Sequence, residues 1–276
     1  MPQPALSDQD NAISRTLVGA RLSAEPLPDF PIQLPTSLEQ AYAIQSASIE
    51  RWPDELVGWK VAMLSPAEQQ RFKAQRLVGP VFRSSFHTVE AGSSIVMPVY
   101  RDGFAAVEAE IVFVLGETSP PTGRDYSDAE LASFIGTVSA GAEIASSPMK
   151  VINDLGAMSV ISDFGNNAGV IAGPAVPNWA TQKPGFLTAT VTVDDATVGS
   201  KAVDAIVGGP LEALRRLVEV SSVRGFELPA GSVVSTGAIT GVHEVELAST
   251  ARVDFGPLGG FDIRFEHFRA KKERDA

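Results

Sequence analysis

The chain has 276 residues, no cysteine, and 22 basic against 33 acidic side chains, a formal net charge of −11. The absence of cysteine excludes disulfides, thiolate metal sites and a cysteine nucleophile. An acidic chain without a basic stripe argues against nucleic acid and against an anionic membrane surface as partners. No apolar run approaches the ~18 residues of a membrane span. The N-terminus also lacks the layout of a signal peptide, so we expect a cytoplasmic protein.

The N-terminal residues predict two helices separated by a proline-rich connector. Apolar spacing predicts the first helix over residues 7–24. The connector ends at a capping box, Thr36-Ser37-Leu38-Glu39, which predicts a second helix to about Trp52. We therefore expect residues 1–55 to form a helical region that packs on the remainder of the chain.

A short strand follows at residues 57–63, and it carries Lys60 between the small residues Gly58 and Ala62. A lysine in an otherwise apolar strand is unusual, because lysines are seldom buried unpaired. The alternative is a lysine on an edge strand whose ammonium group reaches water.

The next segments predict short elements. A capping box with proline at the first helical position, Ser65-Pro66-Ala67-Glu68, predicts a helix to about Gln75. Residues 78–82 indicate a turn that leads into a strand, and residues 93–99 indicate another strand. Phe82 and Phe86 fit either an apolar pocket or plain core.

Residues 104–116, FAAVEAEIVFVLG, predict a buried strand with two carboxylates. Side chains alternate faces along a strand, so Glu108 and Glu110 share a face that continues through Val112 and Val114. Two like charges on an apolar face are costly unless something offsets their desolvation. A divalent cation would do so, and oxygen ligands favour Mg²⁺ or Mn²⁺ over zinc. The alternative is an edge strand with two solvated glutamates, and this stretch alone does not decide between them.

Two further segments carry isolated polar groups. Residues 137–147 are mostly small residues around one acid, Glu143. Its apolar neighbours argue against exposure to solvent, so we expect Glu143 to join Glu108 and Glu110 as a third carboxylate. A third capping box precedes it at Ser127, and residues 151–161 indicate a short helix. Asp163, Asn166 and Asn167 then form a polar cluster before a strand at 168–172, which fits turn chemistry as well as a site.

The last third predicts a hairpin around Asp194-Asp195, a helix over 210–223, and paired strands at 251–255 and 261–265. Between them lies a small-residue loop, Ser235-Thr236-Gly237-Ala238-Ile239-Thr240-Gly241. Its amides and hydroxyls could hold a carboxylate, although a plain glycine turn explains it equally. Many strands without βαβ alternation predict an α+β fold with a β-rich core.

Five segments in this order resemble the 2-keto-4-pentenoate hydratases of the fumarylacetoacetate hydrolase superfamily: VGWKVAMLS, VEAEIVFVLG, AGAEIASS, SDFGNNAGVIAG and STGAITG…ARVDFGPLGGFDIRF. The resemblance extends from about Glu39 to Phe265. It implies a mixed β-sheet roll with peripheral helices, a catalytic domain over residues 56–268, and a charged tail at 269–276.

The resemblance also implies roles for particular residues. The metal ligands fall on Glu108, Glu110 and Glu143, with Mg²⁺ or Mn²⁺ as the cofactor. The catalytic lysine and aspartate fall on Lys60 and Asp163, and the substrate-binding loop falls on Ser235, Thr236 and Gly237. The implied substrate is a small 2-oxo or 2-hydroxy-dienoic acid from the degradation of aromatic compounds, and a homo-oligomer is expected.

One position departs from the hydratase pattern. Hydratases of this type carry an aspartate just before the glycine of the segment that reads here Leu77-Val78-Gly79-Pro80. The similar 4-oxalocrotonate decarboxylases also lack that acid, so decarboxylation is an alternative to hydration. A non-catalytic binding protein of the same fold is a second alternative. Hydrolysis of a C–C bond would need a histidine near the metal, and the three histidines lie outside the motifs.

Overall fold

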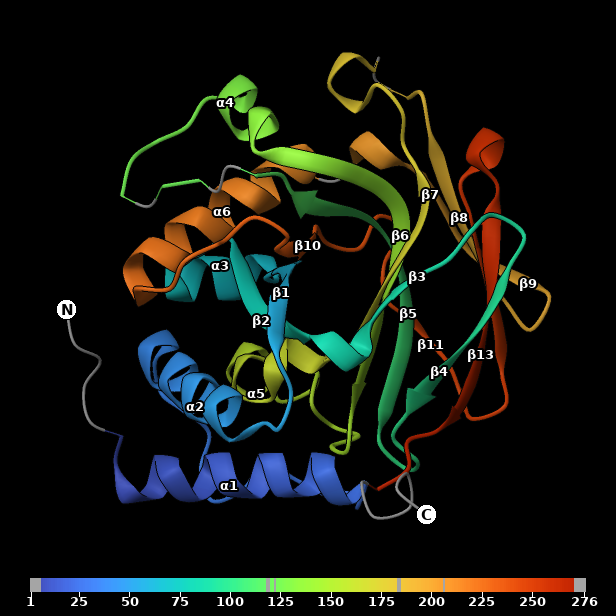
Figure 1. Ribbon diagram of the computed structural model, residues 1–276. Helices are drawn as coiled ribbons and strands as arrows, with labels where there is room; N and C mark the ends of the chain where they lie inside the picture. The colour runs from blue at the N-terminus through green and yellow to red at the C-terminus, as the bar shows by residue number, and fades with distance from the viewer. Residues whose placement is uncertain (1–5, 118–119, 122, 183–184, 206, 271–276) are drawn as a thin grey trace.

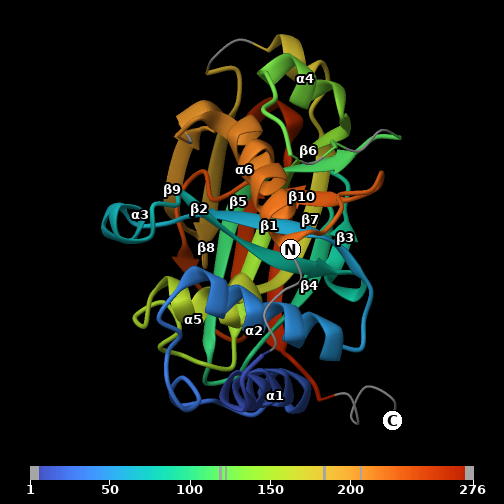
Figure 2. The same cartoon turned by 90° about the vertical axis from the view of Figure 1, so that its left-hand side faces the viewer.

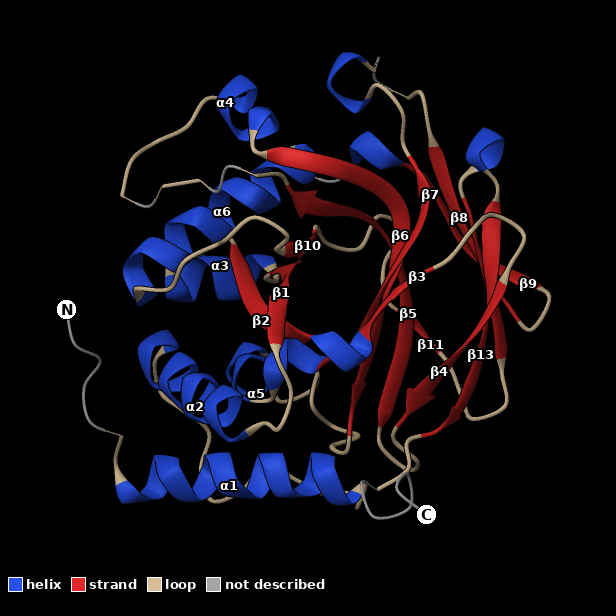
Figure 3. Cartoon of the chain, in the orientation of Figure 1, coloured by secondary structure: helices blue, strands red, loops and turns tan. Residues whose placement is uncertain are grey.

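A computed structural model describes residues 6–117, 120–121, 123–182, 185–205 and 207–270 of the chain. Within these residues the chain forms two β-sheets that pack face to face, and most of the helices lie on the other side of the larger sheet (Figures 1 and 3). This is the α+β architecture with a curled mixed sheet that the sequence predicts. Residues 1–5 and most of the predicted charged tail lie outside the described residues.

The larger sheet has eight strands in the order β2-β1-β10-β5-β6-β7-β3, with β11 paired to β5. The strands are β1 (Leu56–Met63), β2 (Arg76–Phe82), β3 (Phe86–Thr88), β5 (Phe104–Leu115), β6 (Ile135–Ser147), β7 (Asn167–Ala175), β10 (Val233–Ser235) and β11 (His243–Glu244). The β1–β10 and β3–β7 pairs are parallel, and the others are antiparallel. The sheet is curled into a roll, which brings β2, at one end of the strand order, into contact with β7 near the other end.

The smaller sheet has five strands in the order β4-β13-β12-β8-β9. They are β4 (Ser94–Val99), β8 (Thr188–Val193), β9 (Ala196–Ala202), β12 (Thr250–Asp254) and β13 (Gly260–His267). The largest hydrophobic core lies between the two sheets and contains the odd-numbered residues of β5 from Ala105 to Leu115. Phe261 and Phe265 of β13, and Phe255 directly after β12, belong to the same core and are fully buried.

In the described residues, the α-helices lie on the side of the larger sheet that faces away from the smaller sheet, and Figure 2 views the molecule from that side. They are α1 (Asp8–Ser23), α2 (Leu38–Arg51), α3 (Pro66–Phe72), α4 (Asp128–Ser133), α5 (Ala157–Ser162) and α6 (Gly209–Arg224). No helix in the described ranges is long and apolar enough to cross a membrane.

Most of the predicted elements are present, including both later capping boxes, at Ser65 and Ser127. The first capping box is wrong by one residue, because Ser37 caps α2 by accepting a hydrogen bond from the Gln40 amide. Gln40 Oε1 in turn accepts from the Thr36 amide, so Thr36 stands just outside the helix.

Two other local predictions are also wrong. Residues 78–80 form no turn, because all of β2 is a buried strand antiparallel to β1. Pro80 is tolerated there because β2 ends the strand order and needs no second partner along its length. The helix predicted over 151–161 begins only at Ala157, after a series of turns.

The edge-strand alternatives for Lys60 and for the two glutamates of β5 are excluded by the topology. β1 lies between β2 and β10, and β5 lies between β10 and β6. Lys60 is 3% exposed, and Glu108 and Glu110 are 5% and 1% exposed. These charged groups therefore have to find partners inside the protein.

Candidate metal centre

Three carboxylates from two neighbouring strands meet inside the roll. Glu108 on β5 lies directly opposite Glu143 on β6, and Glu110 lies opposite Gly141. One ligand atom from each glutamate lies within 4.8 Å of the others, and all three residues are buried. The glycine opposite Glu110 is needed, because a Cβ at position 141 would lie 2.3 Å from the Ile171 carbonyl oxygen.

Glu110 is held by the loop that follows β10. The Ser235 hydroxyl and the Gly237 amide both donate to its Oε2 atom, the amide at 3.0 Å. Gly237 has φ of +107°, a conformation that favours glycine and turns this amide toward the carboxylate. The other carboxylate oxygen, Oε1, is buried without a hydrogen-bond partner among the described residues. The carboxylate that this loop binds within the protein is that of Glu110, and the substrate-binding role that the resemblance implies for Ser235, Thr236 and Gly237 stays a prediction.

Burial and the neighbouring carboxylates raise the pKa values of Glu108 and Glu110. Desolvation and repulsion by Glu143 raise the pKa of Glu108 to about 8, although Lys60 opposes the shift. Desolvation and repulsion by Glu143 and Glu108 raise the pKa of Glu110 well above its usual range, while Ser235 and Gly237 oppose this. Without a cation, the site therefore favours protonated carboxyl groups at neutral pH.

Lys60 reaches the triad across the curl of the sheet. Its strand lies three places from the strand of Glu143, about 14 Å away in a flat sheet. Because the sheet is rolled, Lys60 Nζ lies 3.2 Å from Glu143 Oε1. Burial lowers the pKa of Lys60, but the charges of Glu143, Glu108 and Glu110 outweigh burial, and the net effect raises it.

Asn167 completes the surroundings of Glu143. It is the first residue of β7, and its Nδ2 donates to Glu143 Oε1 at 2.9 Å. The sequence marks Asn167 only as part of a polar cluster. The structure makes it a side chain that orients one of the three carboxylates.

Asp163 lies apart from the triad in a buried ion pair with Arg21 of α1. Its Oδ2 accepts from Arg21 Nη2 at 3.0 Å and from the Ser147 hydroxyl at 2.6 Å. Arg21 also donates to the backbone carbonyls of Ser146 and Asn167, and so ties α1 to β6 and β7. The catalytic role predicted for Asp163 stays a prediction, and these contacts favour a positioning role.

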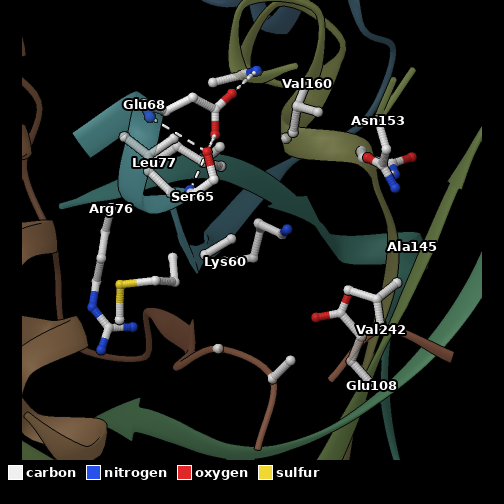
Figure 4. Close-up of a pocket in the computed structure, with 18 of the residues that line it drawn as sticks. Lys60, Ser65, Glu68, Arg76, Leu77, Glu108, Ala145, Asn153, Val160 and Val242 are labelled. Carbon is white, nitrogen blue, oxygen red and sulfur yellow. Dashed lines mark hydrogen bonds between the residues drawn. The ribbon is translucent and has the colours of Figure 1, made fainter. Parts of the chain in front are cut away.

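A cavity of about 490 Å³ opens over the site. Lys60, Glu108 and Gly237 form part of its wall, together with Asn153, Asn166 and Arg76. Figure 4 shows Lys60 between Glu108 on one side of the cavity and Arg76 on the other. The volume is in the range of cavities that hold small organic ligands.

The remaining wall is largely apolar and comes from short elements. Leu77 and Ala62 face the cavity from paired positions of β2 and β1, and Val160 and Val242 add to the wall. Leu77, from the segment that departs from the hydratase pattern, therefore lines the cavity with an apolar side chain.

Glu68 closes one side of the cavity by joining α3 to α5 (Figure 4). Its Oε2 accepts from the Ser65 amide and hydroxyl, and its Oε1 accepts from the Ala157 amide at 2.7 Å. Desolvation would raise the pKa of Glu68, but these bonds outweigh it and lower the pKa.

Other predicted residues are placed away from the cavity. The Thr236 hydroxyl donates to the Ile111 carbonyl at 2.8 Å, so it supports β5. Phe82 packs with Trp52 and Phe164, as the core alternative predicts. His243 bonds to Thr240 at 2.9 Å.

The sequence gives no signal for Arg76 or Arg21. Arg76 stands at the start of an apolar run, and Arg21 in the last turn of a helix, where a basic residue is ordinary. Their burial depends on contacts with residues more than 100 positions away.

The donor set fits a hard divalent cation. Three carboxylates offer only oxygen, the preferred ligand of Mg²⁺ and Mn²⁺. The buried Glu110 Oε1 has no other partner in the described structure, and a cation would also offset the repulsion that raises the pKa values of Glu108 and Glu110. The triad can therefore hold Mg²⁺ or Mn²⁺.

Comparison with known proteins gives a family match and several similar structures. The sequence model of the fumarylacetoacetate (FAA) hydrolase C-terminal family matches residues 60–263. This segment contains the triad, Lys60, Asp163 and the 235–237 loop, whereas Arg21 lies outside it.

Two structures of 4-oxalocrotonate decarboxylase from Pseudomonas putida G7 resemble this fold. The one complexed with calcium and acetate has 21% identity and a TM-score of 0.76 over 94% of this chain and 97% of that chain. The one complexed with magnesium and adipate has 22% identity and a TM-score of 0.75 over the same shares. Fumarylpyruvate hydrolase from Pseudomonas aeruginosa, in complex with Mn²⁺ and pyruvate, has 18% identity and a TM-score of 0.54 over 76% of this chain and 89% of that chain. At these identities the likeness concerns the fold alone.

Proposed function

Because the chain belongs to the fumarylacetoacetate hydrolase family, we propose that it is a divalent-metal-dependent lyase of the 2-keto-4-pentenoate hydratase type, acting on a small 2-oxo acid. One observation carries the proposal. Glu108, Glu110 and Glu143 are buried with ligand atoms within 4.8 Å of one another, and Glu108 and Lys60 lie on the wall of the cavity.

Each polar group around the triad has a task in this reaction. A divalent cation held by the three glutamates would supply a Lewis acid for the charge that develops on the C2 oxygen of a 2-oxo acid. Ser235 and Gly237 fix the carboxylate of Glu110, and Asn167 fixes that of Glu143. With these orientations set by buried contacts, the site needs little rearrangement to act.

Lys60 is the group that exchanges a proton with the substrate. Its Nζ lies on the cavity wall beside Glu143, close enough to exchange a proton with a carbon of a bound dienol. Protonation of the dienol at C5 gives a conjugated ketone that accepts water at C4, and the enol left by this addition takes a proton at C3, next to the oxo group, which is the hydratase outcome. Burial lowers the pKa of Lys60, but the attraction of Glu143, Glu108 and Glu110 outweighs burial and raises it, which favours the ammonium form as the proton donor.

A second candidate is decarboxylation of a related substrate on the same scaffold. Leu77 on the cavity wall favours it, because hydratases of this type carry an acid in this segment. The structural likeness to 4-oxalocrotonate decarboxylase over 94% of the chain adds support. In this reaction a distal carboxylate leaves as CO₂, and its bonding electrons enter the conjugated ketone.

One assay separates these candidates. The Mg²⁺-loaded protein is mixed with 2-hydroxypenta-2,4-dienoate or with 4-oxalocrotonate, and ultraviolet absorbance and released CO₂ are followed together. Loss of the dienoate chromophore without CO₂ supports hydration, and CO₂ release from 4-oxalocrotonate supports decarboxylation. If neither substrate changes while Mg²⁺ binds, the chain is a non-catalytic binding protein and the lyase proposal is wrong. The homo-oligomer and the cytoplasmic location remain predictions.

A further inference from the structure

Arg76 is a buried cation on the cavity wall that the proposed reaction leaves without a task. It is the first residue of β2, and it is 4% exposed. Its side chain lies on the side of the cavity opposite Glu108 (Figure 4). The cavity therefore leaves room for a ligand that has one end at the triad and the other at this arginine.

The guanidinium group has only neutral partners among the described residues. Nη2 donates to the Val207 carbonyl at 2.9 Å, and Nη1 donates to the Thr236 carbonyl at 3.3 Å. Nε is buried and has no hydrogen-bond partner within the described ranges. Of the three guanidinium nitrogens, Nε is thus the one without a partner within the described ranges, on a residue that lines the cavity.

The acids that influence Arg76 are committed elsewhere. Glu212 attracts it but forms ion pairs with Arg215 and Arg216, at 3.0 and 2.6 Å. Glu110 attracts it too, but its Oε2 already accepts from the 235–237 loop. Burial accordingly lowers the pKa of Arg76, since no carboxylate pairs with it directly.

A buried arginine without a counter-ion is rare, because charges taken out of water are normally paired. The planar guanidinium matches a carboxylate better than any other common anion-binding group. We propose that Arg76 binds a second carboxylate at the far end of the substrate, so that the enzyme prefers 2-oxo diacids over 2-oxo acids with an apolar tail. This inference rests on the proposed lyase function, because it needs the oxo-acid end to be held at the triad.

The assignment also bears on the choice between hydration and decarboxylation. When a carboxylate leaves as CO₂, its charge moves into the rest of the molecule. An arginine paired with that carboxylate stabilises the reactant more than the transition state and slows the step. Arg76 therefore favours a substrate that keeps its second carboxylate, as in hydration.

The test compares two ligands that differ only at the far end. Isothermal titration of the Mg²⁺-loaded protein measures the affinity for 2-oxoadipate and for 2-oxohexanoate, which has the same chain length without the second carboxylate. A charge-assisted pair predicts that the diacid binds about ten- to a hundredfold more tightly. Arg76→Gln should remove this preference and leave the affinity for 2-oxohexanoate unchanged.

Two further variants serve as controls. Lys201 lines the same cavity from an exposed position of β9, so Lys201→Met removes the same charge but should keep the preference. Arg76→Lys keeps the charge without the planar fork and should retain part of the preference. If Arg76→Gln does not fold, a several-fold loss of preference in Arg76→Lys carries the test.

Each outcome has one meaning. An unchanged preference in the Arg76 variants, or no preference in the unaltered protein, overturns the role of Arg76 while leaving the lyase proposal intact. If neither acid binds the folded, Mg²⁺-loaded protein, the oxo-acid site itself is refuted, and the role of Arg76 is refuted with it.

Discussion

Replacing Glu108 by Gln should stabilise the metal-free protein above pH 5 and abolish its response to Mg²⁺. The carboxyl group is 5% exposed, and desolvation and Glu143 raise its pKa from 4.5 to about 8. The amide is similar in size and carries no charge, so the variant removes the repulsion without opening a cavity.

The magnitude follows from the pKa values of the folded and unfolded states. Between pH 4.5 and about 8 the folded protein holds a proton on Glu108 that the unfolded chain has lost. Stability on account of this group is therefore full below 4.5 and falls as the pH rises, by about 1.4 kcal/mol per pH unit. From 4.5 to pH 7 the loss is about 3 kcal/mol.

Urea unfolding of chelator-treated protein at pH 5, 6, 7 and 8 tests this expectation. The unaltered protein should lose stability across the series, and Glu108→Gln should lose clearly less. Glu68→Gln is the matched control, because the pKa of Glu68 is lowered and its replacement should destabilise the protein. At a hundred times its dissociation constant, Mg²⁺ should restore about 2.7 kcal/mol to the unaltered protein only. If the stability of the unaltered protein and of Glu108→Gln depends equally on pH, the pKa of Glu108 is not raised in the folded state and the reasoning is wrong.

Three other predictions concern single residues. Glu110→Gln should lose Mg²⁺ binding and turnover together, because Glu110 Oε1 has no hydrogen-bond partner among the described residues and is free to bind the cation. Calorimetry with Mg²⁺ alongside the dienoate assay checks this, and turnover that persists without bound metal would contradict it. Lys60→Met should keep Mg²⁺ binding but slow hydrogen–deuterium exchange at the carbon next to the oxo group of a bound 2-oxo acid by about a hundredfold or more, as measured by NMR; unchanged exchange would remove its role. Asp163→Asn should lower the free energy of unfolding by about 3 to 5 kcal/mol, because it leaves Arg21 buried and without its ion-pair partner. The control, Glu55→Gln, breaks an exposed pair with Arg83 and should lower it by less than about 1 kcal/mol. Equal losses of the two variants in urea unfolding would argue against a contribution from the buried pair.

The sequence predicts most of the local structure and the residue types of the site. Alternation along residues 104–116 assigns Glu108 and Glu110 to one face, and the structure places the odd-numbered residues of that strand in the core between the sheets. The convergence of Glu143 with them depends on strand register, which a local pattern does not contain. The approach of Lys60 depends on the curl of the whole sheet.

The errors have local and non-local causes. A glutamate three residues after Thr36 favours a capping box there, but the helix is capped by Ser37, which accepts from the Gln40 amide, while Gln40 Oε1 accepts from the Thr36 amide. Gly79 and Pro80 favour a turn at residues 78–80, but pairing with β1 overrides that local preference. The pair between Asp163 and Arg21 spans 142 positions and follows no spacing rule.

The two faces of β5 and the wall of the cavity differ in how freely their side chains can be replaced. One face of the strand is fixed by the hydrophobic packing between the sheets, and this packing also sets the spacing of the glutamates on its other face. Much of the cavity wall comes instead from β2, α3 and α5, none of which pairs with β5. Relatives can therefore diverge in substrate preference through these segments while inheriting the same cation-binding strand.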